Sequence, residues 1–368
     1  MDRSASPGRP PSAAGRYELA QEIARGGMGA VFTARDTVLN RTVAVKVLLD
    51  HHAGDAELAG RFLEEARITG QLQHPGIPPV HDLGTLPDGR PFLAMKLLKG
   101  RTLAEQLKDR KTPSHDLPRL IQVFEQVCQS VAFAHDRGVI HRDLKPANVM
   151  VGNFGEVQVM DWGLAKVLAD STPVCPAAPE APPVSLIDPG RHSDSDTQTG
   201  SVIGTSAYMP PEQARGELDR VGRWSDVFSL GGVLCEILTG RPTYTGSRAV
   251  IRAHAELGLV DEAFARLDAC GADPELVVIS KRCLAKEPAD RFADAKAVAE
   301  AVAAHRAGVE KRLRAAEVRA AKRRWQVAVV GCVGLLMLGG VVASRTPSRW
   351  RGHRRAACTH SSVDAWGS

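Results

Sequence analysis

Aromatic residues and closely spaced cysteines are scarce in this 368-residue sequence. Phe, Trp and Tyr together make up 5% of it, and its seven cysteines include no CxxC pair and no metal-ligand spacing. The cysteine pattern argues against a zinc ribbon or a dithiol redox motif and predicts reduced, mostly structural thiols in a cytoplasm. No internal repeat of the solenoid kind is present. The remaining composition, 43% hydrophobic and 24% charged, is that of an ordinary globular protein.

Long apolar stretches are also rare. The first 16 residues are rich in Pro, Gly, Ser and Arg and contain no signal-peptide core, so we expect a disordered leader over 1–16. One run of 17 uncharged residues, 327–343, nearly spans a hydrocarbon core of ~30 Å at about 1.5 Å per residue. A buried core helix is the alternative. Four glycines in the run and Trp325 at its edge favour a transmembrane helix over 325–343.

The net charge of +5 comes from basic residues crowded between positions 311 and 355. A local excess of this kind predicts a membrane surface as partner and no nucleic acid. Within about twenty residues of the apolar run, eight Lys or Arg precede it and five follow it. We therefore expect a basic juxtamembrane helix over 303–324, a short basic tail over 344–368, and a single-pass protein of the inner (cytoplasmic) membrane whose N-terminal region is cytoplasmic.

Between residue 17 and residue 302 the hydrophobic pattern changes once. Residues 17–98 contain short β-rich apolar runs and one helical stretch near 61–72, which predicts a small sheet carrying one helix. From Thr102 onward, apolar residues recur at three- and four-residue spacing, as expected for a helical second lobe. The prolines of residues 170–190 forbid a regular helix or a central strand there, so we expect a mobile insertion.

A glycine-rich turn lies between the first two predicted strands. Its Cβ-free positions would let the backbone fold closely over phosphate groups. A plain tight hairpin is the alternative when the turn is considered alone. The candidate phosphate-binding segment comprises Ile23, Ala24, Arg25, Gly26, Gly27, Met28, Gly29 and, on the following strand, Val31.

A lysine interrupts the next apolar strand, in the run Val43, Ala44, Val45, Lys46. An unpaired ammonium group would be costly in such a strand, so Lys46 needs an anionic partner. The following helical stretch supplies Glu65, and the apolar Ala66 places that position on the buried face. We expect a Lys46–Glu65 ion pair that orients the lysine toward the α- and β-phosphates of a nucleotide. Glu64 is the second choice, because it is rotated by about 100° on the helix.

The most specific pattern is the eight-residue run from His141 to Asn148, followed thirteen residues later by Asp161. In phosphoryl transfer, Asp143 can accept or orient the proton of the attacking hydroxyl, and Lys145 can neutralise the transferring group. The oxygen atoms of Asn148 and Asp161 suit a divalent metal, Mg²⁺ or alternatively Mn²⁺. The predicted catalytic residues are therefore Lys46, Glu65, Asp143 and Lys145, with Asn148 and Asp161 as metal ligands.

With these motifs in this order, residues 17 to about 302 resemble a eukaryotic-like Ser/Thr protein kinase of the bacterial transmembrane type. The resemblance implies the α+β, two-lobed protein kinase fold, with N-lobe 17–97, C-lobe 98–302 and an activation segment 161–212 that contains the insertion 170–190. It implies a non-specific Ser/Thr kinase that uses ATP and a divalent metal to phosphorylate proteins. By the same resemblance, the adenine pocket is lined by Val31, Ala44, the gatekeeper Met95, the hinge residues Leu97 and Leu98, and Met150.

The resemblance also assigns structural roles in the C-lobe. Thr205 is expected to contact Asp143 and Lys145, Glu212 and Arg291 to form a buried ion pair, and Asp226 to anchor the backbone of the catalytic loop. Lys145 followed by Pro146 resembles Ser/Thr-specific rather than Tyr-specific members. The sequence departs from the family pattern without losing a charged catalytic group; the departures are Ala24, Lys96, Trp162 and Pro210.

Arg142, beside Asp143, is a cation that seeks an anion, which in this family is a phosphorylated activation loop. Thr197 and Thr199 match the positions at which bacterial relatives autophosphorylate, and we expect trans-autophosphorylation in a kinase–kinase dimer. A merely soluble polar loop is the alternative. Two other functions are also open. A pseudokinase scaffold would have this fold without the chemistry, and a small-molecule phosphotransferase would lack the activation segment.

Overall fold

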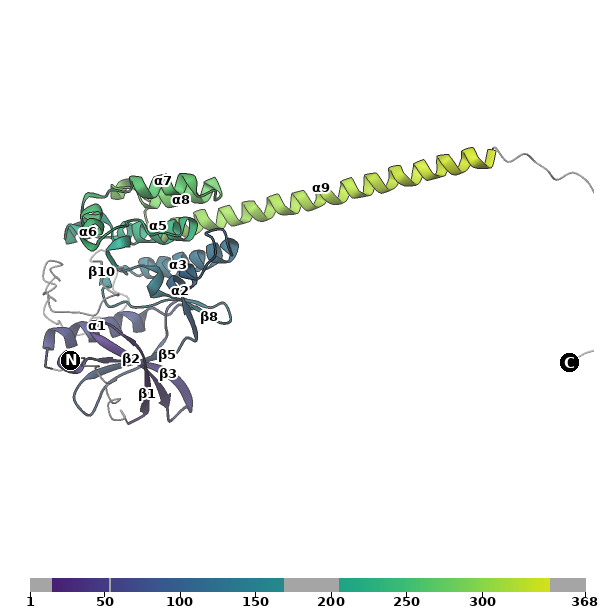
Figure 1. Ribbon diagram of the computed structural model, residues 1–368. Coiled ribbons are helices and arrows are strands. Elements are labelled where there is room, and N and C mark those ends of the chain that lie inside the picture. Colours follow the sequence, from purple (N-terminus) through teal and green to yellow (C-terminus); the bar gives the residue numbers. More distant parts are fainter. Residues whose placement is uncertain (1–14, 53, 169–204, 345–368) are drawn as a thin grey trace, which may run out of the picture. The chain divides into compact units, whose positions relative to one another are not determined.

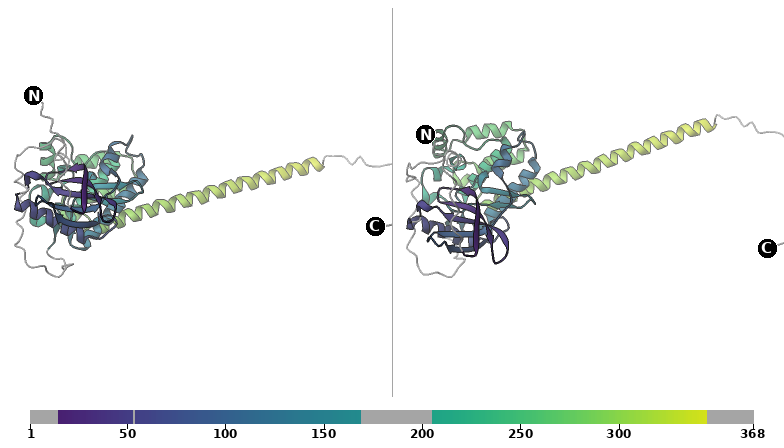
Figure 2. Two further views of the ribbon diagram at one scale, coloured as in Figure 1. Left: turned by 90° about the horizontal axis from the view of Figure 1, so that it is seen from below. Right: turned by 60° about the horizontal axis from the view of Figure 1, so that its bottom comes forward.

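The computed structural model describes residues 15–52, 54–168 and 205–344. The chain forms two compact units, residues 1–306 and residues 307–368. The first unit has a β-sheet N-lobe and a helical C-lobe, which is the expected α+β kinase arrangement (Figure 1). Figure 2 shows the same sheet and the helices beside it from two further directions.

The N-lobe is built on a five-stranded antiparallel sheet in the order β1-β2-β3-β5-β4. Successive residues of the central strand β3 face opposite sides. Val43, Val45 and Val47 join one apolar cluster, whereas Ala44 and Leu48 join a second. The strands are β1 Tyr17–Arg25, β2 Gly29–Asp36, β3 Arg41–Leu48, β4 Val80–Thr85 and β5 Pro91–Lys96.

Helix α1, Ala56–Gln71, packs on the second of these clusters through Phe62 and Ala66. Its start is fixed by Asp55, whose carboxylate accepts hydrogen bonds from the backbone N–H groups of Glu57 and Leu58. The helix therefore begins five residues before the predicted stretch 61–72. Strand β4 was not predicted, because its sequence VHDLGT shows no clear alternation of apolar and polar residues.

The C-lobe surrounds α5, whose residues Phe228, Leu230 and Leu234 are fully buried in the largest apolar cluster. Short strands at its N-lobe side carry the catalytic segments. The helices are α2 Leu103–Lys108, α3 Leu117–Asp136, α4 Pro211–Ala214, α5 Arg223–Thr239, α6 Arg248–Leu257, α7 Asp261–Ala269, α8 Pro274–Cys283 and α9 Ala295–Ser344. The strands are β6 Gly100–Thr102, β7 Val139–Ile140, β8 Val149–Gly152, β9 Val157–Val159 and β10 Lys166–Val167.

Helix α9 is continuous from Ala295 to Ser344 and includes both segments that the sequence analysis expected to be helical, 303–324 and 325–343. No proline interrupts this Ala-rich stretch, so nothing local ends a helix at either predicted boundary. Among the residues described, no helix has both the length and the apolar character needed to cross a membrane. The predicted insertion 170–190, nearly all of the leader 1–16, and the tail beyond Ser344 lie outside the described residues.

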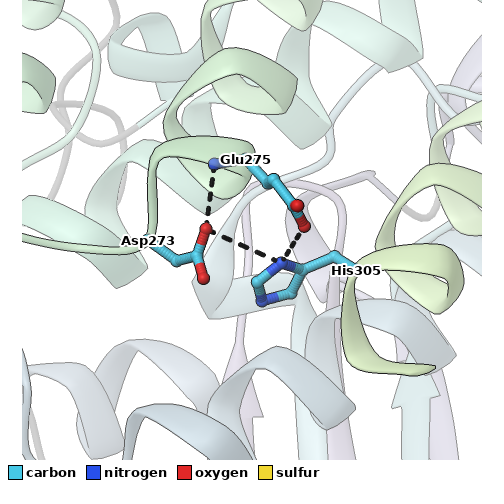
Figure 3. A group of neighbouring side chains, drawn as sticks. All are labelled: Asp273, Glu275 and His305. Carbon is cyan, nitrogen blue, oxygen red and sulfur yellow. Dashed lines mark hydrogen bonds and ion pairs between the residues drawn. The ribbon is translucent and has the colours of Figure 1, made fainter. Parts of the chain in front are cut away.

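The first turns of α9 are fixed to the C-lobe by polar contacts (Figure 3). The buried His305 places Nδ1 2.9 Å from Glu275 Oε2 and 3.9 Å from Asp273 Oδ1. These three ligand-type atoms lie within 4.8 Å of one another, but Asp273 already serves as the N-cap of α8, where the helix dipole disfavours a cation. Arg306 also pairs with Glu125 of α3. We therefore interpret the group as a structural contact between α8 and α9.

Candidate active site

The glycine-rich segment forms the turn between β1 and β2. The N–H of Gly26 donates to Gly29 O at 2.9 Å, and the flanking residues Ala24 and Arg25 still pair with Val31 and Ala30 across the two strands. A Cβ on Gly29 would lie 2.9 Å from Val47 O, so only glycine fits at that position. Most of the segment is exposed; Ile23 keeps 48% of its surface, and Met28 packs partly against the Ala44 cluster.

Lys46 lies on β3 and reaches both lobes. Its Nζ is 2.5 Å from Glu65 Oε1 on α1 and 3.8 Å from Asp161 Oδ1 in the C-lobe. Burial alone would lower the pKa of Lys46, but Glu65 and Asp161 outweigh burial and raise it, so the ammonium form is retained. The predicted pair thus forms with Glu65. Glu64, the second choice, is exposed on the other side of the helix.

The catalytic loop holds the carboxylate of Asp143 between two donors. Lys145 Nζ donates to Asp143 Oδ2 at 2.8 Å. The side-chain amide of Asn148 donates to the same oxygen at 3.1 Å and to the backbone carbonyl of Asp143 at 2.8 Å. Because Asn148 uses its nitrogen in these bonds, its carbonyl oxygen is the atom suited to a metal. Arg142, in this loop, adopts a φ of 69°.

Asp226 binds the backbone of this loop, as the resemblance implied. Its two oxygens accept the backbone N–H groups of His141 and Arg142, each at 2.8 Å. A third bond comes from His135 Nε2 at 2.9 Å. Burial by itself would raise the pKa of Asp226, yet the His135 hydrogen bond and the neighbouring imidazoles bring that pKa below its usual value. The carboxylate is therefore ionised and fixes the loop backbone.

The segment Asp161-Trp162-Gly163 combines an exposed residue, the predicted metal ligand Asp161, with a buried one, Trp162. The side chain of Asp161 is 54% exposed, and its backbone has a φ of 59°. Trp162 is buried, donates Nε1–H to Val159 O at 3.0 Å, and lies 4.6 Å from the His141 ring. It belongs to the same apolar cluster as Ile68 of α1, so this cluster contains residues of the N-lobe helix as well as of the C-lobe.

The predicted adenine-pocket residues lie on both lobes. Ala44 and Met95 face each other across β3 and β5 and share one cluster, against which Val31 and Leu97 pack. Leu98 is buried after β5, and the half-buried Met150 lies on β8, opposite Gln158 of β9. Neither Leu98 nor Met150 belongs to the Ala44 cluster. The binding role of all these residues stays a prediction.

A buried ion pair closes the end of the activation segment. Arg291 donates to both oxygens of Glu212, at 2.8 Å and 3.0 Å, and Ser225 Oγ donates to Glu212 Oε1 at 2.7 Å. Arg291 also donates to three backbone carbonyls, those of Trp224, Ala285 and Lys286. The side chain of Thr205, and the residues Thr197 and Thr199, lie outside the described part.

Two polar residues of the site were missed by the sequence analysis. His135 bonds Asp226 through Nε2 and accepts the Ala295 backbone N–H at Nδ1, at 3.2 Å. Gln213 donates to the Arg142 carbonyl at 2.8 Å and so connects the activation segment to the catalytic loop. A signal existed for His135, since it is a polar residue on the apolar face of a strongly periodic helix. No comparable signal marks Gln213.

The family model for the protein kinase domain matches residues 17–305. The chain is 40% identical over 284 residues to the serine/threonine-protein kinase PknB of Mycobacterium tuberculosis, covering 75% of this chain and 41% of that protein. It is 39% identical to PknB of Mycolicibacterium smegmatis over 283 residues, with the same coverage. It is 37% identical over 296 residues to a probable PknB of Corynebacterium glutamicum, covering 78% of this chain and 41% of that protein.

The chain therefore belongs to the protein kinase family, and its kinase domain is of the eukaryotic-like Ser/Thr type found in bacteria. The chain spans about two fifths of the length of the curated relatives it matches.

Proposed function

We propose that this protein transfers the γ-phosphoryl group of ATP to Ser and Thr hydroxyls of proteins. The observation that carries the proposal is the position of Lys46, whose Nζ lies 2.5 Å from Glu65 and 3.8 Å from Asp161. This brings the phosphate-orienting lysine and the metal-binding carboxylate together. The names of the relatives support the choice of Ser and Thr, as does Lys145 followed by Pro146.

Each charged residue has a defined task in this proposal. Lys46, held by Glu65, orients the α- and β-phosphates. Asp143 accepts the proton of the attacking hydroxyl, and Lys145, 2.8 Å from Asp143 Oδ2, stabilises charge on the transferring group. The carbonyl oxygen of Asn148 and the carboxylate of Asp161 would hold Mg²⁺, or Mn²⁺ in its place, because both are hard oxygen ligands. The metal ion supplies neutralisation of phosphate charge.

A phosphorylation assay with the full-length protein tests this function. Purified protein is incubated with Mg-ATP and a generic protein substrate, and phosphosites are mapped by mass spectrometry. Phosphoserine and phosphothreonine are expected, and Asp143→Asn should lower the rate by about 10²- to 10⁴-fold while ATP binding persists. ATP binding without phosphoryl transfer to any substrate would favour the pseudokinase scaffold instead.

Autophosphorylation of Thr197 and Thr199 between two copies of the chain is part of the proposal. Arg142 supports it: burial lowers the pKa of Arg142, and its buried Nε has no hydrogen-bond partner among the described residues. A phosphate group would provide charge-assisted bonds to this guanidinium. Replacing both threonines by Ala should lower activity, and a variant that keeps full activity would refute this step.

The final part of the proposal is attachment to the inner membrane, with the kinase domain on the cytoplasmic side. It is supported by the uncharged run 327–343, by Trp325, and by the excess of Lys and Arg before the run. Residues 310–326 of α9, which directly precede the run and include Trp325, are exposed. Expression in a bacterium followed by membrane fractionation tests it. The full chain should sediment with membranes, and deletion of 325–343 should release it.

A further inference from the structure

A histidine from the loop between β3 and α1 contacts the glycine-rich turn. His52 ends a short 3-10 segment, Asp50–His52, and its Nε2 lies 3.1 Å from the carbonyl oxygen of Gly27. Gly27 occupies the middle of the predicted phosphate-binding segment. We propose that His52 is a positioning residue for nucleotide binding, which holds the glycine-rich turn closed over the phosphates of ATP.

The chemistry of the contact fixes the direction of the hydrogen bond. A backbone carbonyl can only accept, so Nε2 of His52 must carry the proton and donate it. Both the neutral Nε2–H tautomer and the imidazolium satisfy this requirement. The neighbouring His51 ring lies 4.0 Å from the His52 ring, centre to centre, and makes no hydrogen bond to the turn among the described residues. The hydrogen bond to Gly27 therefore requires a proton on Nε2 of His52.

The turn has few other contacts that would hold it. Gly26 N–H bonds Gly29 O within the turn, and Leu49 N–H donates to Met28 O at 3.2 Å. A Cβ built on Gly27 would meet no atom within 4 Å, so the space beside this residue is open. Two adjacent glycines have a large conformational freedom, which nucleotide binding must remove. A side-chain donor on Gly27 removes part of this freedom in advance.

The same loop connects the turn to helix α1. His52 N–H donates to Leu49 O at 2.9 Å, and Asp55 N–H donates to His52 O at 3.0 Å. Asp55 is the N-cap of α1, the helix that carries Glu65. His52 thus joins the phosphate-binding turn at one side and the start of the lysine-orienting helix at the other. The inference rests on the proposed kinase function, because it assigns the turn to the phosphates of ATP.

Nucleotide titrations of full-length variants test the proposal. His52→Ala is compared with His51→Ala, which removes the neighbouring imidazole but no bond to the turn. Calorimetry measures the Kd of a non-hydrolysable ATP analogue with Mg²⁺ and, separately, the Kd of adenosine. His52→Ala should weaken the ATP analogue by about 2- to 10-fold, as expected for one hydrogen bond, and leave adenosine unchanged. His51→Ala should leave both dissociation constants within about twofold.

A conservative variant separates the hydrogen bond from the shape of the ring. His52→Gln keeps an N–H donor at the end of the side chain and should recover part of the lost affinity for the ATP analogue. The proposal is overturned if His52→Ala binds the analogue as tightly as the wild type, or if analogue and adenosine are weakened equally. Failure of the kinase function is seen separately: the wild type would then bind no ATP, or bind it without transferring phosphate.

Discussion

The catalytic loop and the glycine-rich turn are held in opposite ways. The catalytic loop is held by Asp226, which is 1% exposed, and the end of the activation segment by Arg291, which is 3% exposed. The glycine-rich turn is exposed, with Ile23 at 48%, and few hydrogen bonds restrain it. A proton acceptor must be held in a fixed geometry, whereas a cover over a nucleotide must open to release product. The comparison indicates that rigidity is concentrated where the proposed chemistry occurs.

Disrupting the buried ion pair between Glu212 and Arg291 should have the largest effect on stability. Glu212→Gln leaves the Arg291 guanidinium buried without its carboxylate, and the loss of one partner of a buried ion pair costs about 3–5 kcal/mol. Urea unfolding of the full-length protein measures the change. Glu256→Gln is the matched control, since it removes the exposed Arg252–Glu256 pair and should cost less than about 1 kcal/mol. Equal losses in the two variants would contradict the buried network.

The Lys46–Glu65 pair lies between the two regions, and its removal should have an intermediate effect. Glu65→Gln weakens a charge-assisted bond worth about 1.5–3 kcal/mol, so kcat/KM should fall by roughly 10- to 100-fold. Steady-state kinetics against ATP measures this. Glu64→Gln changes the same group one residue earlier on the exposed side of α1 and should leave kcat/KM unchanged. Similar losses in both would show that general charge, not the pair, matters.

Acid should weaken the anchor of the catalytic loop. The pKa of Asp226 is lower in the folded protein than the ordinary 3.8, so its ionised form stabilises the fold above that pH. This contribution is lost as the pH falls through the lower folded pKa. Asp226→Asn should lower the free energy of unfolding at pH 7 and flatten its decline below about pH 4. Denaturant titrations over this range measure both; Asp268→Asn, at an exposed ion pair with Lys281, should change neither.

The smallest effect is expected on the exposed side, at the first position of the glycine pattern. Ala24 is exposed, and its backbone pairs with Val31, so Ala24→Gly adds conformational freedom without removing a clash. The KM for ATP should change by less than about twofold. Gly29→Ala is the contrasting variant, because the added Cβ would lie 2.9 Å from Val47 O and does introduce a clash. A large gain in ATP affinity from Ala24→Gly would show that the alanine impairs the turn.

Local chemistry explains which parts of the site were predictable from sequence. Lys46 and Glu65 could be paired because a lysine in an apolar strand requires an anion and the helical period selects one glutamate. His135 and Gln213 could not be assigned partners, because their bonds to Asp226 and to the Arg142 carbonyl join segments 91 and 71 residues apart. Strand β4 was missed for a related reason: its place is set by pairing with β5, not by its own alternation.

The imidazole of His135 makes hydrogen bonds through both of its ring nitrogens. His135 receives the backbone N–H of Ala295, the first residue of α9, on one nitrogen and presents its proton to Asp226 from the other. Flipping or rotating that ring would break both bonds together. The first turn of α9, the longest described helix, and the backbone beside Asp143 therefore depend on the same tautomer of His135. Neither segment can shift alone without leaving a buried ring nitrogen of His135 unpaired.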